Sequence, residues 1–299
     1  MAKKSIGMKK KQRISNSFIY VFLVILSIVW LFPFVYLILT SFRGDSPAIS
    51  NNLFPDVWTF DNYLALFTDV DNPIFSIGNI YRSTSNFKSW YVNTFTIAAI
   101  TAIIQTALSL MTAYALSRLR FKGRKGLMQF MLILGMFPGF LTMIAIYNLL
   151  KMIGLKTSVF GLILVYVAGS ATNYYISKGF FDTISRSLDE AAMIDGASRN
   201  TIFWKIILPL SKPIIVYTLL TSFLGPWGDF MMASYLLGGE KEKFTVAVGL
   251  NNWTTVEGQC YYFTRFCAAG VIVSIPIVIM FFWLQNFYVE GVTGGAVKG

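Results

Sequence analysis

The stretch that decides the fold lies between Glu190 and Pro213. It reads Glu190-Ala191-Ala192-Met193-Ile194-Asp195-Gly196 and continues, after nine intervening residues, with Ile206-Ile207-Leu208-Pro209. This is a short amphipathic insert between long apolar runs. Its acidic side chains suit the positive end of a helix, and Gly196 tolerates the left-handed backbone that ends one.

The pattern predicts a helix–turn–helix. Ser187 or Asp189 can cap the first helix, and the second helix is expected to end before Pro209 and Pro213. Ala191 and Ala192 have almost no side chain, so the backbone of another protein can approach closely, and we expect Ala192 to lie against that partner.

The composition indicates a membrane protein. Of 299 residues, 55% are hydrophobic and 13% are charged, with a mean hydropathy of +0.60, whereas a soluble domain has about 25% charged residues. About 20 apolar residues cross a bilayer as a helix, and the runs lack the alternation of a barrel. We therefore predict an all-α, polytopic protein with six transmembrane helices: Phe18–Thr40, Trp90–Ser117, Leu127–Leu150, Ser158–Phe180, Pro213–Leu236 and Phe266–Tyr288.

Basic residues predict the orientation. Most of the 25 Lys and Arg fall in segments 1–17, 118–125 and 181–212 when the N-terminus is inside, which places both termini in the cytoplasm. The net charge of +11 then reflects topology and contact with anionic lipid, not nucleic acid. The loop 118–125 is either an orientation signal or a contact with a cytosolic partner. The first apolar run is too long for a signal-peptide core, so we expect it to remain as a span.

Two outward segments, 41–89 and 237–265, are long enough to have structure. The first has Trp58, Phe60, Tyr63 and Phe67 at roughly helical spacing, which predicts a small helix packed on the membrane surface. The second opens with a Gly-Gly turn and continues into Phe244-Thr245-Val246-Ala247-Val248, a run with β propensity.

The sequence argues against chemistry of its own. It contains no histidine, the usual general base and metal ligand. It also lacks the Gly-x-x-x-x-Gly-Lys-Ser/Thr loop that cradles phosphates. We therefore expect no catalytic residue, no metal site and no ATP hydrolysis by this chain alone.

A candidate substrate pathway lies in the fourth and fifth predicted spans. Gly225-Pro226 is expected to break the fifth span near mid-membrane, and broken helices in transporters line binding sites. Trp227 offers an apolar face to a sugar ring, and Asp229 can accept hydroxyl hydrogen bonds unless it lies at the outer boundary. Asn173 and Tyr174 either face the pathway or pack against neighbouring helices.

The spacing of Glu-Ala-Ala, Gly and Ile-x-Leu-Pro resembles the coupling loop, or EAA motif, of ABC-importer permeases. The matching positions are Glu190, Ala191, Ala192, Asp195, Gly196, Ile206, Leu208 and Pro209. The C-terminal run 291–299, Gly-Val-Thr-Gly-Gly-Ala-Val-Lys-Gly, resembles the tail of the MalG-type subunit of maltose and maltodextrin importers. Phe244–Gly249 resembles the start of that subunit's last periplasmic loop.

This resemblance implies a type I importer permease domain over residues 18–290, between a basic N-terminus at 1–17 and a tail at 291–299. It implies a bacterial inner-membrane location and several partners: a related, MalF-like second permease, two copies of a cytoplasmic ATPase that uses ATP and Mg, and an extracytoplasmic sugar-binding protein. The loop from Asn251, Asn252 and Trp253 to Thr264 would reach into that binding protein, and the tail would reach the ATPase dimer.

Other functions stay open at this point. The transported sugar can be a galacto-oligosaccharide or several sugars instead of maltodextrin. A self-sufficient secondary transporter or channel would need ion-coupling carboxylates within the spans, and only Asp229 qualifies. A membrane scaffold or receptor subunit gives no reason for the spacing around Glu190.

Overall fold

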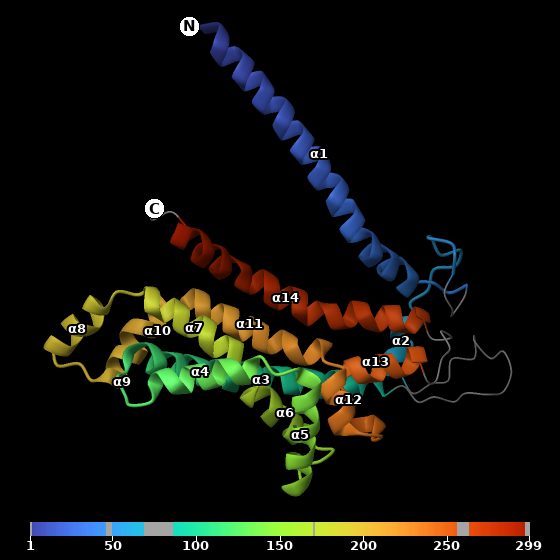
Figure 1. Ribbon diagram of the computed structural model, residues 1–299. Helices are drawn as coiled ribbons and strands as arrows, with labels where there is room; N and C mark the ends of the chain where they lie inside the picture. Colours follow the sequence, from blue (N-terminus) through green and yellow to red (C-terminus); the bar gives the residue numbers. More distant parts are fainter. Residues whose placement is uncertain (1, 46–49, 69–85, 170, 256–262, 297–299) are drawn as a thin grey trace. The chain divides into compact units, whose positions relative to one another are not determined.

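The computed structural model describes residues 2–45, 50–68, 86–169, 171–255 and 263–296 (Figure 1). Within these ranges the secondary structure is helical, apart from one isolated bridge between Arg43 and Trp58. The predicted all-α class is therefore confirmed for the described part of the chain. The helices are α1 (Ala2–Ser41), α2 (Asp61–Phe67), α3 (Phe87–Arg118), α4 (Arg124–Gly135), α5 (Gly139–Met152), α6 (Val159–Ala168), α7 (Ala171–Thr183), α8 (Arg186–Ile194), α9 (Arg199–Ile202), the π-helix η2 (Phe203–Ile207), α10 (Leu208–Leu210), α11 (Lys212–Gly228), α12 (Met231–Leu237), the 3-10 helix η3 (Lys241–Lys243), α13 (Val246–Thr255) and α14 (Phe263–Ala296).

Several helices are long and apolar enough to cross a membrane. Four qualify by themselves: Ser15–Ser41 of α1, the whole of α3, Val159–Thr183 across α6 and α7, and Phe263–Gln285 of α14. Two bent pairs qualify only when both members are counted as one span. Six, the predicted number of spans, is the upper limit that the described helices allow by length and composition, and the second bent pair joins Arg199–Leu210 to α11 where the prediction joined α11 to residues up to Leu236.

The third predicted span, Leu127–Leu150, is not one straight helix. Helices α4 and α5 meet at a bend of 102° between Gly135 and Gly139. Pro138 has no backbone N–H to donate and adopts φ −56° and ψ 125°, outside the helical region. The proline therefore ends the helical hydrogen bonding at this point.

The fifth predicted span breaks, but not where the sequence indicates. Helix α11 continues through Pro226 to Gly228, and the chain leaves the helical region at Asp229, with φ −81° and ψ 102°. Pro226 and Trp227 are both buried, and we attribute the survival of the helix past Pro226 to that packing. The prediction of a break at Gly225-Pro226 is thus wrong by about one turn.

Residues 1–85 and 253–272 form one compact unit. A fully buried Arg43 organises the chain after α1 by donating to Asp45 at 2.9 Å, to Ser50 at 3.2 Å and to the carbonyl of Asn52 at 2.5 Å. Asn62 of α2 donates to the carbonyls of Ser41 and Arg43. Helix α2 is the small helix predicted for this segment, although Trp58 and Phe60 precede it.

Residues 86–252 and 273–299 form the second unit. Its central element is α3, which packs against α6, α7 and α11. Figure 1 shows α8 and α9 at one end of this group and α12 at the other. One buried cluster, which includes Phe181, Phe203 and Ile207, lies between α3 and the α8–α10 region. A second cluster joins Ala98 and Ala102 of α3 to Phe223 and Trp227 of α11.

The β propensity of the run Phe244–Val248 predicts an extended segment. This prediction is wrong, because helix α13 begins at Val246. The backbone N–H of Val246 donates to Thr94 Oγ1 of α3 at 2.8 Å. The side chain of Thr94 therefore supplies an acceptor for a backbone N–H in the first turn of α13, which has no acceptor within the helix itself. This long-range contact outweighs the local preference.

Candidate functional site

The predicted helix–turn–helix is present and begins with α8. Its N-cap is Ser185, whose Oγ accepts the backbone N–H of Ser187 at 3.3 Å. The cap is therefore two residues earlier than the nearer of the two predicted caps, Ser187 and Asp189. Asp189 instead lies inside the first turn and is buried.

Gly196 ends α8 as predicted, with φ +82°. The N–H of Gly196 donates to the carbonyl of Met193 at 3.1 Å, and the N–H of Ala197 donates to the carbonyl of Ala192 at 2.9 Å. This pair of bonds is the Schellman motif, which needs a left-handed residue at the position of Gly196. The motif fixes the angle at which the chain leaves α8.

The second half of the loop is more irregular than the sequence indicates. Residues Phe203–Ile207 form a π-helix, in which the N–H of Leu208 reaches the carbonyl of Phe203. The helix then passes through Pro209 and stops at Leu210, and α11 leaves at a bend of 82°. Pro209 and Pro213 lack the N–H groups that would bond the carbonyls of residues 205 and 209, so this helix cannot continue straight.

Helix α8 has two different faces. Glu190, Ala191 and Asp195 are exposed, as is Ile194 with 86% of its surface accessible. Ala192 is half-buried against the cluster of Phe181, Phe203 and Ile207. The structure thus places Ala192 against its own domain, and the small exposed residue is Ala191.

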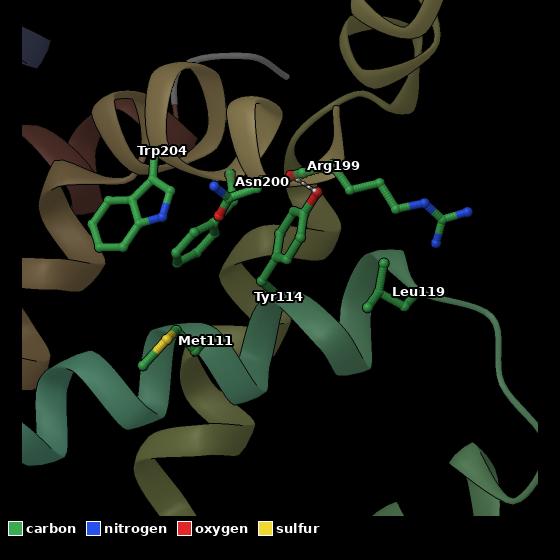
Figure 2. A pocket seen from close by; sticks show the side chains of 7 residues that line it. Met111, Tyr114, Leu119, Arg199, Asn200 and Trp204 are labelled. Carbon is green, nitrogen blue, oxygen red and sulfur yellow. Dashed lines mark hydrogen bonds between the residues drawn. The ribbon is translucent and has the colours of Figure 1, made fainter. Parts of the chain in front are cut away.

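Two of the motif positions in the second half of the loop, Ile206 and Leu208, pack against the buried cluster. Both side chains are half-buried, and Pro209 is exposed. Beside them lies an open pocket of about 270 Å³, shown in Figure 2. Its floor includes Tyr114 of α3, whose hydroxyl donates to the carbonyl of Arg199 at 3.1 Å, while the Arg199 side chain points away from Met111 and Tyr114.

The side chain of Arg118, the last residue of α3, is buried next to α8. Its Nη2 donates to the carbonyls of Phe181 at 3.0 Å and Ile184 at 2.8 Å. Its Nε lies 3.3 Å from Oδ2 of Asp189, and the two side chains are only 4% and 13% exposed. By sequence, Arg118 belongs to the basic loop 118–125, which is expected to be a signal for membrane orientation or a contact with a cytosolic partner.

Trp227 and Asp229 are engaged within the chain. Trp227 is 5% exposed, and its ring centroid lies 5.6 Å from that of Tyr91 and 5.9 Å from that of Phe223. Asp229 is half-buried, and both of its oxygens accept hydrogen bonds: Oδ2 from the hydroxyl of Tyr166 at 2.9 Å, and Oδ1 from the N–H of Met232 at 3.1 Å. Asp229 therefore bonds a backbone N–H in the first turn of α12.

The other two pathway candidates, Asn173 and Tyr174, lie on α7, and both are half-buried. The amide of Asn173 faces hydroxyl groups of α11, with Ser222 Oγ at 3.4 Å and Thr221 Oγ1 at 3.5 Å. One turn further along α7, Ser177 meets Thr218 at 3.4 Å. A row of polar side chains therefore runs along the contact between α7 and α11.

The expected contact loop for a binding protein is described only in part. Asn251 and Asn252 are half-buried in α13, Trp253 is 6% exposed, and residues 256–262 lie outside the described part of the chain. The chain ten residues before this loop is fixed to α3: Trp90 Nε1 donates to the carbonyl of Lys241 at 2.7 Å, and Asn93 donates to the carbonyl of Glu242 at 2.8 Å.

A family model described as "Binding-protein-dependent transport system inner membrane component" matches residues 105–294, which include the whole helix–turn–helix. The chain belongs to this family. It is similar to the maltodextrin transport system permease protein MalD of Streptococcus pneumoniae, with 36% identity over 98% of this chain and 99% of that protein. It is also similar to the galactooligosaccharides transport system permease protein GanQ of Bacillus subtilis, with 37% identity over 98% of this chain and 99% of that protein.

One further relative and one solved structure are also similar to this chain. The maltose/maltodextrin transport system permease protein MalG of Vibrio vulnificus is 36% identical over 90% of this chain and 91% of its own length. A solved bacterial ABC transporter involved in the import of alginate has the same fold, with a TM-score of 0.74 over 92% of this chain and 97% of that chain, at 24% identity.

Sequence reasoning missed two residues at the sites of this inner membrane component. Arg118 pairs with Asp189, and Tyr166 holds Asp229, in each case across a long sequence separation. No local periodicity reveals such pairs. A partial signal was available for both, because an ionisable residue at or inside a span is buried only with a partner.

Proposed function

We propose that this chain is one of two permease subunits of an ATP-driven, binding-protein-dependent carbohydrate importer, with maltodextrin-type oligosaccharides as substrates. The observation that carries the proposal is α8 itself: an exposed helix face that includes Glu190 and Ala191, ended by a Schellman motif at Gly196 within the region that defines the family. The names of the relatives, maltodextrin and maltose/maltodextrin permeases, support the substrate class.

The proposed partners are a second, related permease, two copies of a cytoplasmic ATPase that binds ATP and Mg, and an extracytoplasmic sugar-binding protein. A solved neighbour of the same fold is a bacterial alginate ABC transporter in complex with an alginate pentasaccharide-bound periplasmic protein, which supports the last of these. We further propose that the chain spans the bacterial cytoplasmic membrane six times with both termini inside, and that the tail from residue 291 contacts the ATPase.

In this proposal α8 rests on the ATPase through its exposed face. On its other side, Ala192 packs against the cluster of Phe181, Phe203 and Ile207, which also contains residues of α3 and α11. Protein interiors are close-packed, so a displacement of α8 moves these helices instead of being absorbed. ATP-driven movement of the ATPase would thus reach the spans directly.

We place the sugar pathway along the contact between α7 and α11. Amide and hydroxyl groups such as Asn173 and Tyr174 suit the hydroxyls of a sugar, and the polar row there continues through Ser222 and Thr218. Trp227 and Asp229 support the wall of this pathway, since each is engaged by neighbouring residues. Asn251, Asn252 and the segment after them are the proposed contact with the binding protein.

One observation favours a second substrate class. The galactooligosaccharides permease GanQ is as similar to this chain as the maltodextrin permease MalD. Both substrates are short neutral sugar chains, so the permease alone does not decide between them.

The test is reconstitution of the full complex in proteoliposomes with its cognate binding protein. We expect uptake of maltotetraose that depends on ATP, on the binding protein and on all subunits, and no ATP hydrolysis above background by this chain alone. If the complex imports galacto-oligosaccharide and does not import maltotetraose, the substrate class is the second one, galacto-oligosaccharides. Sugar uptake by this chain alone would contradict the subunit role.

A further inference from the structure

We propose that Arg118 is a positioning residue for coupling: it holds α8 against the C-terminal end of α3 through Asp189, and this joint is needed for ATPase coupling and not for assembly. The inference rests on the proposed function, in which α8 is the helix that meets the ATPase.

A single guanidinium group joins three elements of one unit. It belongs to α3, its Nη2 donates to the carbonyl of Phe181 in α7 and to that of Ile184 after α7, and its Nε faces Asp189 in α8. Lysine has no planar fork and cannot reproduce these directions at once. The side chain is therefore suited to fix the mutual positions of the three elements.

The pair differs from the other ion pairs in the described ranges. Arg43–Asp45, Lys178–Asp182 and Lys243–Glu240 each join residues within one helical turn of sequence. Arg118 and Asp189 are far apart in sequence and belong to different helices. Among the ion pairs between residues that the structure describes, this one alone joins two different helices.

The pair is poorly arranged to add stability. Arg118 Nε and Asp189 Oδ1 are both buried and have no hydrogen-bond partner, so the contact is an ion pair without full hydrogen bonding. Burying two charges in this way costs desolvation free energy, and well-packed apolar residues of similar size often replace such pairs without loss of stability. A role in position explains the pair better than a role in folding.

Asp189 is one residue before Glu190, on the buried side of α8, while Glu190 is exposed. A shift at Asp189 therefore moves the exposed face directly. A second contact acts at the same place, because Arg186 Nη2 donates to the carbonyl of Ser117 at 3.2 Å. Both contacts connect α8 to the last turn of α3.

The experiment uses the complete complex with its binding protein and three variants. R118M/D189L removes both charges and leaves no buried charge unpaired, R118K keeps the charge without the fork, and R120A removes an exposed arginine as the matched control. The measurements are ATPase co-purification, the thermal unfolding midpoint, the stimulation of ATP hydrolysis by the sugar-loaded binding protein, and sugar imported per ATP.

We expect R118M/D189L to assemble with an unfolding midpoint close to that of the wild type, while stimulation falls about tenfold or more because α8 is displaced. R118K should recover part of the stimulation, and R120A should equal the wild type. Wild-type stimulation in R118M/D189L would overturn the inference, and so would failure of that variant to assemble, since the joint would then serve folding.

A G196V complex separates this inference from the proposed function. If G196V abolishes stimulation and R118M/D189L does not, only the role of Arg118 is overturned. If G196V also has wild-type stimulation, α8 is not the coupling element and the proposed function itself is contradicted at this site.

Discussion

Gly249 of α13 lies directly against the indole ring of Trp90 in α3. A β-carbon placed on Gly249 would be 2.0 Å from Cε3 of that ring. The same ring donates from Nε1 to the carbonyl of Lys241, so Trp90 contacts the chain between α12 and the middle of α13 at two points. The absence of a side chain at Gly249 is what lets α13 approach α3.

We therefore predict that Gly249→Ala lowers the free energy of unfolding by about 1–3 kcal/mol, the usual cost of overpacking. Gly179→Ala is the matched control, since a β-carbon there meets nothing within 4 Å. The measurement is thermal or denaturant unfolding in detergent. Equal stability of the two alanine variants would contradict the close approach of Gly249 to Trp90.

Gly196 gives a prediction of strain without crowding. A β-carbon there has open space around it, but the φ of +82° is unfavourable for a branched side chain. Gly196→Val should cost roughly 1–2 kcal/mol and reduce transport, while insertion into the membrane persists. Gly196→Asn should keep most of the transport, because Asn visits the left-handed region. Uptake in the complex is the measurement, and equal loss in both variants would argue against a conformational cause.

Asp229 and Tyr166 give a prediction about the pathway wall. Tyr166→Phe removes one hydrogen bond, at a cost of about 1 kcal/mol, and Asp229→Ala also removes the first-turn bond of α12, at a similar cost. We expect lower stability in both variants with unchanged apparent sugar affinity. A clear affinity change in Asp229→Ala alone would return this carboxylate to direct sugar contact.

Asp45 predicts a dependence on acid. Partial burial raises the pKa of Asp45, but hydrogen bonds from its own backbone and from Arg43 outweigh it, and the pKa lies below its ordinary value of 3.8. A lowered folded-state pKa adds stability above the unfolded pKa and loses it as the pH falls through the folded one. The stability advantage of the wild type over Asp45→Asn should therefore be present at neutral pH and vanish on acidification, between about pH 5 and pH 2.

Unfolding measured at several pH values tests this prediction. Asp56→Asn is a control in the same segment, because Asp56 accepts a long hydrogen bond from the amide of Asn52 at 3.5 Å, whereas Asp45 accepts one from the guanidinium group of Arg43. A constant difference between wild type and Asp45→Asn over the whole pH range would show that the carboxylate charge is not what matters at this position.

Local signals predicted those parts of the fold that local chemistry determines. The apolar runs located the long helices, and Gly196 located the end of α8, because a left-handed turn has few alternatives to glycine. The bend between α4 and α5 also had a signal, since Pro138 lacks the N–H that a helix needs, but the apolar composition on both sides concealed it.

The remaining features depend on partners distant in the sequence. Val246 is in a helix and not a strand because Thr94 accepts its N–H. Trp227, expected to face a sugar, is covered by Tyr91 and Phe223. Arg118, which belongs to a basic loop by sequence, is held by Asp189. No window of neighbouring residues contains these contacts.

Helix α3 has a mechanical property that follows from its sequence. It extends over 32 residues, or about 48 Å, and contains neither glycine nor proline, the residues at which helices usually kink. Near the first turn of α3, Trp90 and Asn93 bind the carbonyls of residues 241 and 242, and in its last turn Arg118 binds α8. Such a rod transmits a tilt or a slide from one end to the other with little loss. We therefore expect a displacement of residues 241–246 to reach Asp189 as a movement of the whole helix.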